Sequence, residues 1–97
     1  MNISANQKEL TKDITMEKND IFMIIKEKVS LVMDDIDQNK INQSVSLKEL
    51  GLNSIDRAEI IMLTLEALQL KSSLVDFAVA KNIGELCDIM KSKCDKT

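Results

Sequence analysis

The sequence predicts an all-α fold, a small four-helix bundle with three main helices, a short third helix and a long loop between the first two. Proline is absent and only two glycines occur among 97 residues, so few residues would interrupt a helix. Apolar residues recur at helical spacing in three segments. Because Phe22 and Phe77 are the only aromatic residues, aliphatic side chains and methionine must fill the core of one small domain.

The first long helix follows a polar stretch. We interpret residues 1–15 as a flexible N-terminal tail, because they show no clear hydrophobic period, and residues 16–97 as the folded domain. We expect the helix to end between Asp34 and Asp37. The apolar residues that mark its inward face, at spacings of four, four, three and four, are Ile21, Ile25, Val29, Val32 and Ile36.

The segment DIDQNKINQSVSLKEL, residues 35–50, is expected to form a long loop, because it is polar and carries only isolated apolar residues. Those apolar residues would hold the loop against the core. Ser46 lies three positions before Glu49, which is the spacing of a capping box. We therefore expect one short helical turn within the loop.

The second long helix is expected to begin at Asn53 or Ser54. Asn53 precedes Asp56 by three positions, as an N-cap residue precedes its partner. The acids expected on the outer side are Asp56, Glu59 and Glu66, and with Arg57, the only positive residue between Ser54 and Leu70, the segment carries a net charge of −2. The predicted inward face consists of Ile55, Ala58, Met62, Leu65 and Leu68 or Gln69.

Two further elements complete the predicted bundle. Ser72 and Ser73 precede a short helix expected over residues 74–78. The last helix is expected to open at Asn82, with Glu85 as its capping partner. Its predicted inward face consists of Ile83, Leu86, Cys87 and Met90.

Charge and composition argue against several classes of protein. The net charge of −3 disfavours a protein that binds nucleic acid and favours partners with basic surfaces. No apolar run approaches the roughly 18 residues of a membrane span. No signal peptide is visible at the N-terminus. We therefore expect a cytoplasmic monomer that binds neither nucleic acid nor membrane.

No metal site or disulfide is predicted, and histidine is absent. Asp34, Asp35 and Asp37 resemble a calcium loop only in part, because its sixth and twelfth positions lack glycine and glutamate. Cys87 and Cys94 would lie about 10 Å apart along one helix, too far for a disulfide. We interpret both as free thiols in a reducing compartment, with Cys87 in the core.

Ser54 has three possible roles. A serine at a helix start can accept a hydrogen bond from a free backbone N–H, and local sequence alone favours this role. A catalytic serine needs a base, but the chain has no histidine and no lysine lies beside Ser54 in sequence. The serine can also accept a modification, because the positive end of a helix dipole favours an attached phosphodiester.

The stretch LKELGLNSIDRAEIIMLTLEAL resembles the prosthetic-group region of acyl carrier proteins. That family has a G-x-D/N-S-hydrophobic motif, matched here by Gly51, Leu52, Asn53, Ser54 and Ile55. The resemblance covers roughly residues 19–93 and includes the order of the helices. It implies the acyl carrier fold, no catalysis by this chain, and a 4′-phosphopantetheine group attached to Ser54 by a phosphopantetheinyl transferase. Asn53 departs from the aspartate that the family most often has there.

The stretches NSIDRAEIIMLTLEAL and VDFAVAKNIGELCDIM are similar to the stand-alone donor carriers of polyketide β-branching cassettes. Acceptor carriers usually have a tryptophan shortly after the serine, where this chain has Ile60 and Ile61. The resemblance implies that an acyltransferase loads malonyl and a decarboxylating ketosynthase converts it to acetyl. A 3-hydroxy-3-methylglutaryl-CoA (HMG-CoA) synthase-like enzyme then takes the acetyl group. The residues expected to contact partners are Asn53, Ile55, Asp56, Arg57 and Glu59.

The sequence leaves alternatives open. The chain fits a general fatty acid or polyketide carrier as well as a donor carrier. It also fits a helical adaptor that binds partners through its second helix and never carries an acyl group. An enzyme is disfavoured, because histidine and a glycine-rich phosphate loop are both missing.

Overall fold

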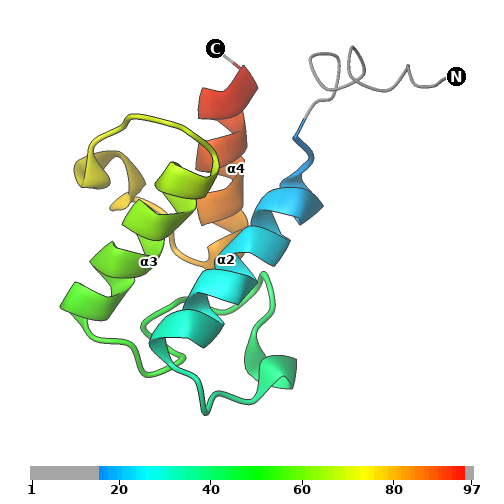
Figure 1. The fold of residues 1–97 in the computed structure, drawn as a ribbon, viewed down its shortest axis with the longest axis vertical. Helices are drawn as coiled ribbons and strands as arrows, with labels where there is room; N and C mark the ends of the chain where they lie inside the picture. Colours follow the sequence, from blue (N-terminus) through cyan, green and yellow to red (C-terminus); the bar gives the residue numbers. More distant parts are fainter. Residues whose placement is uncertain (1–15, 96–97) are drawn as a thin grey trace, which may run out of the picture.

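The computed structural model describes residues 16–95, which form three α-helices and two short 3₁₀-helices (Figure 1). The all-α prediction is confirmed, and the short third helix is a 3₁₀ element. Residues 1–15, predicted as a tail, lie outside the described residues. No helix within residues 16–95 is long and apolar enough to cross a membrane. The elements are α2 (Lys18–Val32), η1 (Gln38–Lys40), α3 (Ser54–Ala67), η2 (Leu74–Phe77) and α4 (Ile83–Asp95).

The helices pack around α2, which contacts both α3 and α4. Figure 1 shows that α2 runs in the opposite direction to α3 and α4, and that the long α2–α3 connection lies across one end of the bundle. The short η2 contacts both α3 and α4. It therefore bridges these two helices.

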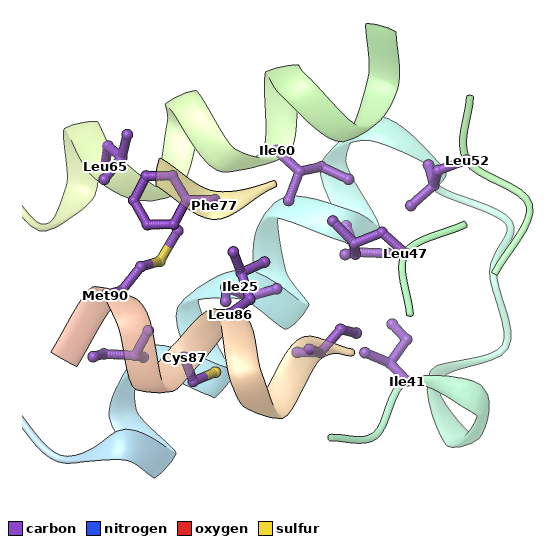
Figure 2. Close-up of a cluster of buried hydrophobic side chains, with 13 residues drawn as sticks. Ile25, Ile41, Leu47, Leu52, Ile60, Leu65, Phe77, Leu86, Cys87 and Met90 are labelled. Carbon is purple, nitrogen blue, oxygen red and sulfur yellow. The ribbon is translucent and has the colours of Figure 1, made fainter. Parts of the chain in front are cut away.

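The core is almost entirely aliphatic, as the composition predicted, and Figure 2 shows it between the three helices. Phe77 of η2 is the only aromatic residue that is buried within residues 16–95, and it lies between Leu65 of α3 and Met90 of α4 in Figure 2. Cys87 is a small, fully buried member, as expected. The buried apolar residues are Ile21, Ile25, Val29, Ile41, Leu47, Leu52, Ile60, Leu65, Phe77, Ile83, Leu86, Cys87 and Met90.

Helix α2 ends earlier than the predicted boundary between Asp34 and Asp37. Met33 leaves the helical conformation at φ −131° and ψ 81°, so Val32 is the last helical residue. The N–H of Ile36 then donates to the Met33 carbonyl over 3.2 Å. This turn brings Ile36 back against the core, so Ile36 contributes from the loop and not from the helix.

The predicted inward face of α3 is correct at Leu65, which is buried, but wrong at Ile55 and Met62. Ile55 and Met62 are 76% and 54% exposed, whereas the buried residues are Ile60, Thr64 and Leu65. Apolar residues occupy several sides of this helix, so its periodicity does not identify one stripe. Thr64 can be buried because its hydroxyl donates a 2.8 Å hydrogen bond to the Ile60 carbonyl, which satisfies the polar group.

Side-chain hydrogen bonds hold η2 in place. Ser73 caps it as predicted, since its hydroxyl accepts a 3.3 Å bond from the backbone N–H two residues further on. The Asp76 carboxylate accepts bonds from the Ser72 hydroxyl (2.7 Å) and the Lys93 ammonium (3.1 Å). These two donors lower the pKa of Asp76. The bond from Lys93 connects η2 to α4 next to Phe77, whose ring is buried in the core.

We expect Phe77→Ala to lower the free energy of unfolding by about 3 kcal/mol, because it leaves a cavity between α3 and α4. Urea denaturation followed by circular dichroism measures this loss. Val79→Ala is the matched control, since Val79 is exposed close to η2 and should change stability by less than about 0.5 kcal/mol. Equal losses in the two variants would contradict the assigned role of Phe77.

Candidate functional site

A hydrogen-bonded turn leads into the predicted site. The Glu49 N–H donates to the Ser46 hydroxyl (3.0 Å), and the Ser46 N–H donates to Glu49 Oε1 (2.8 Å). The Leu50 N–H donates to the Ser46 carbonyl over 3.3 Å. The predicted capping box and its single helical turn are therefore confirmed.

Gly51 ends this turn in the left-handed region, at φ 98°. Its N–H donates to the Lys48 carbonyl (2.9 Å), and the Leu52 N–H donates to the Leu47 carbonyl (3.3 Å). This pair of bonds defines a Schellman motif, whose usual apolar contact is supplied by the buried Leu47 and Leu52. The reversal directs Leu52 into the core and leaves Ser54 on the surface.

Asn53, and not Ser54, caps α3. The Asn53 side-chain oxygen accepts a 2.8 Å hydrogen bond from the Asp56 N–H, as the spacing predicted. Ser54 is the first helical residue and is exposed. Its hydroxyl makes no hydrogen bond within residues 16–95. The capping role that local sequence favours for Ser54 is therefore wrong, and its hydroxyl is free to react.

Arg57 has a structural contact that sequence reasoning missed. Its Nη1 donates a 2.7 Å hydrogen bond to the Leu52 carbonyl, and the side chain is half-buried. The bond connects the first turn of α3 to the segment that enters it. No local spacing rule predicts a hydrogen bond from an arginine side chain to the carbonyl five residues before it. The sequence therefore suggested only a partner contact for Arg57.

The outer side of α3 combines apolar and acidic side chains. Ile55 and Met62 are exposed there, together with Glu59 and Glu66, whereas Asp56 is half-buried. A shallow groove of about 560 Å³ runs along this side and includes Ser54. The described residues that line it are Ser54, Ile55, Ala58, Glu59, Met62, Leu63 and Glu66.

The described part of the chain does not equip Ser54 for catalysis. The sequence has no histidine, and no basic side chain within residues 16–95 is hydrogen-bonded to the serine. Over the same residues, no three potential metal ligands come together. Asp37, one of the carboxylates that resemble a calcium loop, accepts a 2.9 Å hydrogen bond from the Asn39 N–H and caps η1.

Cys87 is a free thiol in the core, as expected, and Cys94 also carries a thiol. Burial raises the pKa of the Cys87 thiol to about 11. Burial also raises the pKa of Cys94, which is half-buried near the end of α4. Burial therefore makes both thiols weaker nucleophiles, because the thiolate is the reactive form.

Residues 24–90 match the family model described as the phosphopantetheine attachment site. This match spans more than half of the chain and includes the turn before Ser54, all of α3 and most of α4. The chain therefore belongs to the family of phosphopantetheine-binding acyl carrier proteins.

Two particular relatives are similar to this chain over most of its length. It is 37% identical over 78 residues to the polyketide biosynthesis acyl-carrier-protein AcpK of Bacillus subtilis (strain 168), which covers 80% of this chain and 95% of the relative. It is also similar to a solved chain from the crystal structure of the curacin biosynthetic pathway HMG synthase in complex with acetyl donor-ACP. That match has a TM-score of 0.75 and 38% identity, and it covers 80% of this chain and 100% of the other.

These comparisons confirm the resemblance to acyl carrier proteins and the acyl carrier fold. The chain is a carrier and not an enzyme, and its prosthetic group is 4′-phosphopantetheine. The structure fits this group at the start of α3, where a serine hydroxyl is exposed beside the positive end of a helix.

We expect Gly51→Ala to lower the free energy of unfolding by about 1 kcal/mol, because a side chain disfavours the left-handed conformation. A Cβ at this position would approach only Met33 Cε, at 3.8 Å, so the loss reports backbone strain and not a clash. Gly51→Asn is the control, since asparagine tolerates left-handed φ better and should lose less stability in urea denaturation. A larger loss for asparagine than for alanine would contradict this explanation.

Proposed function

We propose that the Ser54 hydroxyl is the attachment point of the 4′-phosphopantetheine arm. The observation that carries this proposal is the exposed Ser54 hydroxyl at the first position of α3, without a hydrogen bond to residues 16–95. The hydroxyl is therefore accessible to a transferase, and no hydrogen bond to the described residues competes with its reaction. Ser54 also lies within the stretch that matches the family model.

The start of α3 suits the phosphodiester that joins the arm to the serine. The helix dipole places positive potential there, and the free N–H groups of the first turn face outward. Asn53 caps the helix without adding a negative charge next to the phosphodiester, which an aspartate would add. The arm itself supplies a thiol that holds an acyl group as a thioester.

We infer that the acyl group is malonyl and then acetyl, and that the chain donates acetyl to an HMG-CoA synthase-like enzyme in polyketide β-branching. Two relatives support this inference. One is named for polyketide biosynthesis, and the other is named as the acetyl donor in a complex with an HMG synthase. The partners would be a phosphopantetheinyl transferase, an acyltransferase, a decarboxylating ketosynthase and the synthase-like enzyme. A cytoplasmic location and a monomeric state stay predictions.

We further propose that the outer side of α3 contacts these partners. Ile55 and Glu59 are exposed beside Ser54 and suit direct contact. Arg57 donates a hydrogen bond to the Leu52 carbonyl, so it acts mainly by positioning the helix start, and the half-buried Asp56 is less available for contact than Ile55 and Glu59. The exposed acids would steer α3 toward basic surfaces and set the rate of encounter.

We expect the wild-type chain to gain the mass of phosphopantetheine when it is incubated with a broad-specificity transferase and coenzyme A. Ser54→Ala should abolish this gain in intact-protein mass spectrometry. Ser92→Ala is the matched control, because Ser92 is also an exposed serine in a helix, and it should be modified like the wild type. A gain that survives in Ser54→Ala would refute the assignment, and full biological function in that variant would favour the adaptor alternative.

We expect Ile55→Ser to raise the Kd for the synthase-like partner roughly tenfold, because it removes an exposed apolar anchor next to the arm. Leu31→Ser is the matched control, since Leu31 is a similarly exposed apolar residue on α2. Isothermal titration calorimetry with the loaded carrier measures both variants. Equal weakening by both substitutions would argue against a docking surface on α3.

Acetyl transfer separates the donor role from that of a general carrier. The acetyl-loaded chain should transfer its acetyl group to the synthase-like enzyme at a higher rate than an acetyl-loaded fatty acid carrier does. Equal rates would favour the general carrier, while leaving the attachment at Ser54 intact.

A further inference from the structure

A second groove, of about 470 Å³, lies between α3, η2 and the start of α4. Apolar side chains line much of it, including Ile61 of α3, Phe77 of η2 and Leu86 of α4. Its charged lining residues within residues 16–95 are all basic, and they are Lys48, Arg57 and Lys81. This charge is opposite to that of the groove along the outer side of α3, where Glu59 and Glu66 contribute.

These three cations have no ion-pair partner in the described part of the chain. Arg57 uses one of its five N–H donors on the Leu52 carbonyl, which leaves the others for a ligand. Lys48 and Lys81 are exposed, so both can turn toward the groove. In a chain with a net charge of −3, this groove therefore gathers unneutralised positive charge beside an apolar wall.

The groove lies close to the start of α3. Arg57 follows Ser54 by three residues, which is a rise of about 4.5 Å along the helix axis. Lys48 belongs to the hydrogen-bonded turn that leads into α3. Lys48 and Arg57 therefore belong to the segments on either side of Ser54, so an arm attached there can fold back along the groove that they line.

We propose that Lys48, Arg57 and Lys81 bind the free carboxylate of a malonyl group carried on Ser54, and that the groove does not hold an acetyl group in this way. The inference rests on the proposed attachment of the arm at Ser54. A malonyl thioester ends in a carboxylate, whereas an acetyl thioester is neutral. The three cations therefore distinguish the two cargoes by charge, and the apolar wall accommodates the methylene groups of the arm.

The attraction is modest and sensitive to salt, because two of the three cations are exposed to water. The malonyl group therefore exchanges between the groove and solvent, and a partner enzyme can withdraw it. The arm's phosphodiester is a second anion that these cations could attract. The phosphodiester is present whether the arm is unloaded, acetylated or malonylated. A comparison of these three forms therefore separates binding of the malonyl carboxylate from binding of the phosphodiester.

The test compares the amide NMR spectra of ¹⁵N-labelled chain bearing the unloaded arm, the acetyl arm and the malonyl arm. A broad-specificity transferase attaches each arm from the matching coenzyme A thioester, so loading does not depend on the donor role. We expect shifts at groove residues that occur only with malonyl and that fade as salt is raised. The double variant Lys48→Gln/Lys81→Gln should lose these shifts, whereas Lys71→Gln, an exposed lysine outside the groove lining, should retain them.

Each other outcome decides the question. Equal shifts with all three arms would assign the groove to the phosphodiester or the arm itself, and would overturn this inference. Malonyl-specific shifts that survive in the double variant, or their complete absence in the wild type, would overturn it as well. In those cases the attachment at Ser54 stands. Failure of any arm to attach at Ser54 would refute both proposals.

Discussion

The position of the site depends on two backbone hydrogen bonds that the first turn of α4 donates to the α2–α3 connection. The Ile83 N–H donates to the Val45 carbonyl and the Gly84 N–H to the Gln43 carbonyl, each over 2.8 Å. The first N–H groups of a helix have no partner within it, so the connection supplies the missing acceptors. Gly84 permits this approach, because a Cβ there would lie 3.1 Å from the Gln43 oxygen. These bonds hold the connection against α4, and they therefore fix the position of the turn that leads to Ser54.

Helix α3 meets three different environments. One side packs into the core through Ile60 and Leu65. The outer side is apolar and acidic, and the side that faces η2 borders a groove with only basic charges among its described lining residues. Ser54 is exposed at the first position of the helix, where all three sides begin. The same short helix can thus approach a basic partner on one side while its other side attracts an anion.

The sequence predicted the features that depend on neighbouring residues. The capping box of Ser46 and Glu49 and the aliphatic face of α2 follow from fixed spacings along the chain, and they agree with the structure, as does the cap by Asn53. The buried face of α3 could not be predicted, because apolar residues lie on several of its sides and Thr64 looks polar in sequence. The basic groove could not be predicted either, since Lys48, Arg57 and Lys81 meet only after the chain has folded.

The burial of Cys87 has a consequence for the chemical lifetime of the cargo. Thiolates attack thioesters, so an accessible thiolate on the carrier would take the acyl group from the arm by exchange. Cys87 is fully buried, and burial raises the pKa of its thiol to about 11, which leaves almost no thiolate at neutral pH. Burial raises the pKa of Cys94 in the same direction. Burial thus disfavours the thiolate form of both cysteines, which weakens them as competing acceptors for the domain's own cargo.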